Sequence, residues 1–116
     1  MTVRRIVANI ATPDLARAGV FYRDILGMTV AMDHGWIVTY ASPLESLAQI
    51  SFASEGGSGT AVPDLSIEVD NFDEVHARIL KARLPIEYGP VTEPWGVRRL
   101  FMRDPFGKLV NILSHS

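Results

Sequence analysis

Hydrophobic and polar positions alternate along the first stretch of the chain and then recur at helical spacing. Residues 3–11 divide into two alternating sets, which predicts a strand. One set is apolar and the other mixed: Ile6, Ala8 and Ile10 against Arg5, Val7 and Asn9. A helix is expected next, with Thr12 or Asp14 as its N-cap and Gly27 ending it. Its buried stripe is predicted to be Leu15, Ala18, Tyr22, Ile25 and Leu26.

The same order of elements recurs after a polar connector. Residues 28–32, 36–41 and 46–53 predict three strands, and the Gly/Ser-rich residues 54–60 predict a flexible connector. A strand at 65–69 and a helix follow. The helix is expected to begin with a capping box of Asn71 and Glu74 and to bury Phe72, Val75, Ile79 and Leu80. A strand at 86–91 leads into a closing hairpin.

That hairpin spans residues 94–113. Asp104-Pro105-Phe106-Gly107 has the residue preferences of a type I turn, and placing the turn there pairs Arg103 with Lys108. Because side chains alternate across a strand, two faces follow. One is expected to be packed core, with Phe101, Val110 and Ile112. The other is expected to be a pocket wall, with Arg98, Leu100, Met102, Leu109 and Asn111.

A strand, a helix and three strands, twice over, predict an α+β fold of two βαβββ modules. The expected organisation is one domain: module one at 1–53, a linker at 54–61 and module two at 62–116. Each module leaves one sheet face uncovered after its helix covers the other. Setting the two together as a half-open curved sheet or barrel, concave faces inward, resolves this.

Two motifs carry a family resemblance. The hairpin's P-W-G-V-R-R and R-D-P-F-G-K-L-V-N-I-L resemble the closing hairpin of the vicinal oxygen chelate superfamily, and D-L-A-R-A-G-V-F-Y-R-D-I-L-G-M at 14–28 resembles its first helix. That group includes glyoxalase I, extradiol dioxygenases and bleomycin-resistance proteins. The resemblance implies the curved pairing of modules, within one chain or with a second chain, and a homodimer. Neither motif specifies a reaction.

Composition excludes several classes of function. The 116 residues are 47% hydrophobic with a net charge of −2, which is typical of a globular domain and gives no basic surface for nucleic acid. The absence of cysteine excludes disulfides and thiolate metal sites. No apolar run reaches the length of a membrane span, and the first residues lead into a strand instead of a signal sequence. We expect a cytoplasmic protein without a membrane partner.

Parity along the strands predicts a concave face of mixed polarity, which suits a small-molecule site. Trp95 and Trp36 are expected at its rim, where their rings contact a flat ligand, and Arg98 is expected to hold a ligand carboxylate or phosphate. The predicted ligand-binding residues are Asn9, Trp36, Gln49, Ser66, Glu68, Trp95, Arg98, Met102 and Asn111.

The resemblance also implies where a metal would be bound. Its ligand positions fall on Val7, Gln49 or Ser51, Asp64 and Asn111. Valine cannot coordinate and an asparagine amide is a weak donor, so we predict no metal and no cofactor. The histidines do not replace the missing ligands, because they fall in a turn, beside a helix stripe and at the frayed penultimate position: His34, His76 and His115.

Three functional hypotheses follow. The first is a metal-free binder of a small aromatic or polar molecule, resembling the bleomycin-resistance branch. The second is a lyase, isomerase or dioxygenase resembling glyoxalase I, with a divalent metal at positions that the predicted register misplaces. The third is a dimeric domain with a vestigial pocket. For acid–base chemistry the candidates are Asp64 and Glu68, although Glu68 is equally explained by an ion pair with Arg98.

Overall fold

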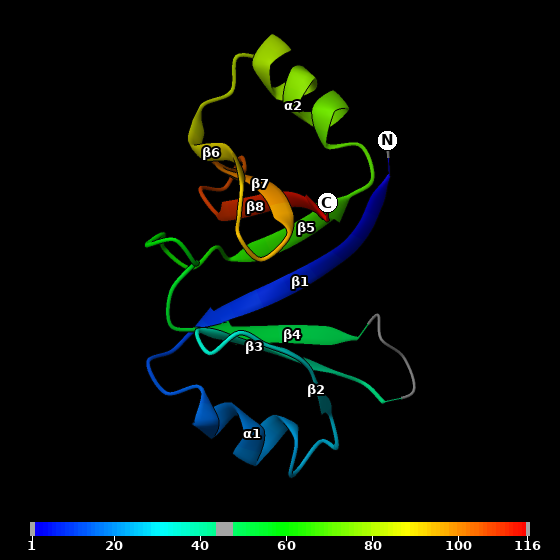
Figure 1. The fold of residues 1–116 in the computed structure, drawn as a ribbon, viewed down its shortest axis with the longest axis vertical. Helices are drawn as coiled ribbons and strands as arrows, with labels where there is room; N and C mark the ends of the chain where they lie inside the picture. Colours follow the sequence, from blue (N-terminus) through cyan, green and yellow to red (C-terminus); the bar gives the residue numbers. More distant parts are fainter. Residues whose placement is uncertain (1, 44–47, 116) are drawn as a thin grey trace. The chain divides into compact units, whose positions relative to one another are not determined.

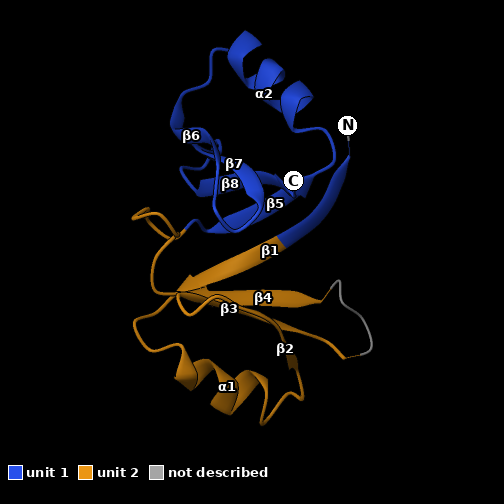
Figure 2. Cartoon of the chain, viewed as in Figure 1, with its two compact units in different colours: residues 1–6, 63–116 blue, residues 7–62 orange. Residues whose placement is uncertain are grey.

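The computed structural model describes residues 2–43 and 48–115 in two compact units. Unit 2 comprises residues 7–62, and unit 1 comprises residues 1–6 with 63–116 (Figure 2). The first six residues, which the sequence pattern placed with module one, therefore lie with the second half of the chain.

Unit 2 holds one helix and most of the first strand. Its elements are β1 (Val3–Ala11), α1 (Ala16–Tyr22), β2 (Thr29–Asp33), β3 (Ile37–Ala41) and β4 (Gln49–Ala53) (Figure 1). The strand order is β2-β3-β4-β1, with β1 parallel to β4 and the other pairs antiparallel. The strand predicted at 46–53 begins in residues outside the described part of the chain.

Unit 1 repeats the arrangement. Its elements are β5 (Leu65–Val69), α2 (Phe72–Lys81), β6 (Ile86–Thr92), β7 (Val97–Arg103) and β8 (Leu109–His115) (Figure 1). The order is β5-β8-β7-β6, with β5 parallel to β8. The predicted α+β class and the twofold βαβββ pattern are confirmed. None of the described helices is long and apolar enough to cross a membrane.

Helix α1 is shorter than the sequence indicates. Its N-cap is Leu15 with no side-chain hydrogen bond, so neither predicted cap is correct. The Thr12 hydroxyl instead accepts from the N–H of Asp14 (3.1 Å), which forms a turn before the helix. After Tyr22 the amide of residue 26 bonds to the carbonyl of residue 21, five positions back. This widened turn leaves Ile25 and Leu26 exposed instead of buried.

Helix α2 forms with the predicted cap. The N–H of Glu74 donates to the Asn71 side chain (3.3 Å), and the Asn71 amide donates back to the Glu74 carboxylate (2.7 Å). Phe72 and Ile79 are buried against the sheet, whereas Leu80, which the helical spacing placed in the stripe, is exposed. The core of unit 1 lies between α2 and one face of β5, β7 and β8.

The closing hairpin is one residue out of the predicted register. Arg103 pairs with Leu109, not Lys108, and Leu100 pairs with Ile112. The loop holds one residue more than a four-residue turn, because Gly107 takes a positive φ of 79° and Asp104 accepts from the amides of residues 106 and 108. This is a type I turn extended by a glycine bulge. Every residue of β8 is therefore shifted to the opposite face relative to β7.

The Gly/Ser-rich connector is an ordered loop. The N–H of Gly56 donates to the carbonyl of Thr60 (2.8 Å), and the Thr60 hydroxyl donates to the carbonyl of Gly57 (2.7 Å). A Cβ on Gly56 would lie 2.1 Å from the carbonyl oxygen of Ala61, so a side chain there forces the backbone to move. Gly56 thus allows close packing, whereas Gly57 and Gly59 have positive φ values of 85° and 75° that favour glycine.

The start of β1 is attached to the end of β5 by a hydrogen bond with a predictable pH dependence. The N–H of Thr2 donates to Asp70 Oδ1 (2.8 Å) and holds the pKa of this carboxyl below its ordinary value of 3.8. Because the pKa is lower in the folded state, the stabilisation is present above the unfolded pKa and is lost as the pH falls through the folded pKa.

We expect Asp70→Asn to reduce the decrease in the free energy of unfolding that wild type shows as the pH is lowered. The measurement is the free energy of unfolding in urea at stepped pH between about 5 and 2, the range around the carboxyl pKa. Asp14→Asn, at an exposed aspartate before α1, is the matched control. An equal flattening in both variants would contradict the assignment of this pH dependence to Asp70.

Candidate functional site

The face of β5, β7 and β8 that points away from α2 holds buried polar and charged side chains of unit 1. Ser66 lies opposite Asn111, and Asn111 lies opposite Phe101, so the three residues form one row across the sheet. In the next row Leu113 lies opposite Arg99. Polar and aromatic residues are thus buried together on the face that α2 does not cover.

A buried ion pair is at the centre of this face. Arg99 and Glu93 have side chains only 3% exposed, and Arg99 Nη2 lies 2.6 Å from Glu93 Oε2. Arg99 Nε donates to the same oxygen at 2.7 Å, and the Tyr88 hydroxyl donates to it at 2.9 Å. Three donors on one carboxylate oxygen offset much of the cost of burying both charges.

Three aromatic rings enclose the Arg99 guanidinium. Its Cζ lies 4.7 Å from the ring centroid of Phe101, 4.9 Å from that of Trp95 and 5.4 Å from that of Tyr88. Ring faces attract a desolvated cation, at about 0.5–2 kcal/mol each. We refer to Tyr88, Glu93, Trp95, Arg99 and Phe101 as the arginine cage.

A tight turn between β6 and β7 positions two members of the cage. The N–H of Glu93 donates to the carbonyl of Val97 (2.7 Å), and the N–H of Gly96 donates to the carbonyl of Glu93 (3.1 Å). Gly96 has a φ of 92°, a conformation that side chains disfavour. The turn brings Trp95 back over the guanidinium of the strand that follows it.

Beside the cage lies a buried amide with an unused acceptor. Asn111 Nδ2 donates to the Ser66 hydroxyl (3.1 Å), whereas Asn111 Oδ1 is buried and has no hydrogen-bond partner within the described chain. An unsatisfied buried acceptor costs about 1–3 kcal/mol. The oxygen is therefore an acceptor that the described side chains and backbone leave unused.

The remaining polar group of this face is an ion-pair network at the strand ends. Glu68 Oε1 lies 3.2 Å from Arg5 Nε, and Glu68 Oε2 lies 3.1 Å from His115 Nδ1. The sequence-based alternative paired Glu68 with Arg98. Glu68 does form an ion pair, but its partner is Arg5. The expectation that His115 is frayed is also wrong, because the residue belongs to β8 and contacts Glu68.

Two predicted binding residues lie on the opposite face. Arg98 pairs with Asp73 of α2 and its guanidinium lies 4.8 Å from the Phe72 ring centroid, while Met102 is part of the core beneath α2. Their placement on the pocket wall was wrong because the bulge at Gly107 reverses the relation between β7 and β8. The packed-core assignment of Phe101 was wrong for the same reason.

In unit 2 the predicted parity is correct. Ser51 lies opposite Asn9 on β1 and opposite Thr39 on β3, on the face away from α1. The hydroxyls of Thr39 and Ser51 are 2.7 Å apart and buried. Gln49 begins β4 on that face, and Trp36, just before β3, stacks on His34 with ring centroids 6.3 Å apart. Ligand contact by Asn9, Trp36 and Gln49 stays a prediction.

The donor chemistry does not fit the metal that the resemblance implies. No group of three or more His, Cys, Asp or Glu side chains lies in position to hold an ion within residues 2–43 and 48–115. Val7 offers no donor atom, and Asp64 Oδ2 already accepts from the N–H of Leu109 (2.9 Å). Asn111 turns its amide nitrogen to Ser66 and keeps one neutral oxygen.

Sequence reasoning missed the arginine cage. It selected Trp95, left Tyr88 out of the predicted binding residues, and passed over Glu93 and Arg99. A usable signal exists in E-P-W-G-V-R-R: opposite charges on the two sides of a tight Trp-Gly turn lie across a hairpin from each other. The neighbouring Arg98 was selected instead, because the assumed register of the hairpin placed Arg98 on the pocket side and Arg99 on the core side.

Comparisons with known proteins support one family. Residues 4–112 match the family model described as the Glyoxalase/Bleomycin resistance protein/Dioxygenase superfamily. Among curated proteins, none matches the chain.

Solved structures share the fold at low sequence identity. An NAD-dependent benzaldehyde dehydrogenase from Legionella pneumophila has a TM-score of 0.75 at 15% identity, over 96% of this chain and 99% of that one. A superfamily member from Vibrio splendidus 12B01 has a TM-score of 0.69 at 16% identity, over 97% and 99%. A variant of Streptomyces coelicolor methylmalonyl-CoA epimerase with 2-nitronate-propionyl-CoA reaches 0.70 at 17%, over 99% and 96%. Proteins named for such different reactions show that this fold does not determine the chemistry.

Proposed function

Because the chain belongs to the glyoxalase/bleomycin resistance protein/dioxygenase superfamily, we propose that it binds a small molecule without a metal ion. The site is the face of unit 1 that carries the arginine cage and Asn111. The observation that carries the proposal is the buried, unpartnered Oδ1 of Asn111. A folded protein rarely leaves such an acceptor unused, and a ligand donor satisfies it.

The surroundings of Asn111 define the class of ligand. Arg99 is neutralised by Glu93 and enclosed by rings, so the face offers aromatic surface and neutral polar atoms instead of a free charge. A planar, uncharged molecule with an N–H or O–H donor fits this chemistry, with its donor on Asn111 and its ring against the half-buried Trp95.

The absence of a metal is supported by the donor set. A divalent ion needs several imidazole or carboxylate ligands. The implied positions supply a valine, a glutamine or serine, a hydrogen-bonded aspartate and an asparagine amide. The alternative is a metal-dependent lyase, isomerase or dioxygenase. Metal analysis of protein purified without chelator separates the two, since one tightly retained ion per chain would overturn the metal-free proposal.

The binding test is a thermal-shift screen over planar metabolites, with hits confirmed by calorimetry. A ligand at 100 times its dissociation constant adds about 2.7 kcal/mol to the free energy of unfolding. Asn111→Ala is expected to weaken a hit about two- to tenfold, the worth of one hydrogen bond. Ser114→Ala is the matched control, because Ser114 is on the same strand but opposite Arg98 on the other face. Equal affinity for wild type and Asn111→Ala would remove Asn111 from the site.

A further inference from the structure

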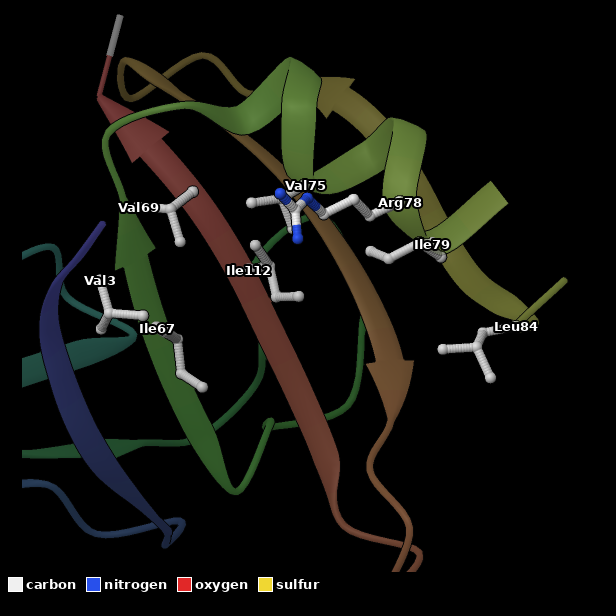
Figure 3. Close-up of a pocket in the computed structure, with 8 residues that line it drawn as sticks. All are labelled: Val3, Ile67, Val69, Val75, Arg78, Ile79, Leu84 and Ile112. Carbon is white, nitrogen blue, oxygen red and sulfur yellow. The ribbon is translucent and has the colours of Figure 1, made fainter. Parts of the chain in front are cut away.

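A hollow lies on the other side of the same sheet, between α2 and the strands. It measures about 370 Å³, and Figure 3 shows Val3, Ile67 and Ile112 of the strands facing Val75 and Ile79 of the helix across it. Because α2 covers this face and the arginine cage lies on the opposite one, the hollow is distinct from the site proposed above.

The walls of the hollow are aliphatic, and its one charged side chain is a cation. Arg78 borders it, and none of the described aromatic residues lines it. Arg78 is 65% exposed, and its contact with Glu74 is long at 3.4 Å. Branched aliphatic walls favour a flexible alkyl chain over a flat ring, and the guanidinium of Arg78 favours an anionic end group.

The volume of the hollow limits the length of the alkyl chain that it can hold. At about 30 Å³ for one water-sized heavy atom, the hollow holds about a dozen heavy atoms. That is the size of a fatty carboxylate of about ten carbons. We propose that the hollow binds a free medium-chain fatty acid, with the alkyl chain between α2 and the sheet and the carboxylate on Arg78.

Calorimetry with sodium decanoate, below its micelle concentration, tests the proposal. We expect one decanoate per chain and an affinity that falls about fourfold for each methylene removed, equivalent to about 0.8 kcal/mol. Arg78→Gln should weaken decanoate binding about threefold or more and leave 1-decanol unchanged, because only the acid uses the guanidinium. Arg17→Gln, at an exposed arginine of α1, is the charge-matched control.

A blocking variant locates the binding. Val3 is 53% exposed at the mouth of the hollow, so Val3→Trp narrows it without disturbing the core, and Val20→Trp at a 63% exposed position of α1 is the size-matched control. Decanoate binding lost in Val3→Trp and kept in Val20→Trp and Asn111→Ala supports the proposal. Binding that survives Val3→Trp, or no binding at all, overturns it. So does a dimer that Val3→Trp dissociates, because a second copy then occupies the hollow.

Discussion

Glu93→Gln is expected to destabilise the fold by about 3–5 kcal/mol, the usual cost of removing one member of a buried ion pair. The substitution leaves the Arg99 guanidinium charged in a site where it is only 3% exposed. It also replaces the carboxylate oxygen that accepts from Arg99 and from Tyr88. The rings of the arginine cage retain part of the stabilisation, but they supply no opposite charge. The measurement is the free energy of unfolding in urea, followed by tryptophan fluorescence.

A second ion pair on the adjacent strands provides the control. Glu87 pairs with Arg103 at 2.7 Å, but both side chains are about half exposed. Glu87→Gln should therefore change the free energy of unfolding by less than about 1 kcal/mol. The double variant Glu93→Leu with Arg99→Met is expected to be more stable than Glu93→Gln, since it leaves no buried charge. If Glu93→Gln lowers the free energy of unfolding only as little as Glu87→Gln does, the burial of the Glu93–Arg99 pair makes no difference to its contribution to stability.

Leu100→Ala is expected to cost about 2–5 kcal/mol, because Leu100 has no exposed surface at all. Its side chain is in the core beneath α2 with Val69 and Phe72. The cavity left by the deleted atoms has rigid walls on both the sheet and the helix side, which limits relaxation. The same urea experiment measures the loss.

Leu80→Ala is the control for the core substitution. Leu80 is 58% exposed on α2, so removing its side chain should change the free energy of unfolding by about 0.5 kcal/mol or less. A comparable loss in both variants would mean that Leu80 is buried in solution, for example by a second copy of the chain.

The fold was largely predictable, because it depends on features that are local in sequence. The alternation of apolar and polar residues, the Asn71 cap and the glycine-rich connector define the βαβββ repeats without any long-range information. The face of unit 2 that points away from α1 is local in the same sense: the parity of Gln49 and Ser51 on β4 holds because no bulge interrupts the pairing of that strand with β3.

The face of unit 1 that carries the arginine cage was not predictable to the same degree. A single extra residue at the Gly107 bulge exchanges the faces of Phe101 and Met102 relative to β8. Asp-Pro-Phe-Gly is compatible with a four-residue turn and with the longer bulged loop, so the sequence leaves both registers open. The identity of the buried arginine depended on that choice: the structure buries Arg99 and leaves Arg98 on the helix side.

Strand β1 is divided between the two units, and this affects whether a single repeat is a complete polypeptide. Its first residues lie with β5 and β8, whereas the rest of the strand pairs with β4. The second repeat is therefore incomplete without residues from the start of the chain. A half-length polypeptide starting at Pro63 would lack the segment that borders β5, and it would present bare edge amides and carbonyls to other molecules. The duplicated pattern in the sequence therefore does not coincide with the two units, because residues 2–6 belong to the unit that holds residues 63–115.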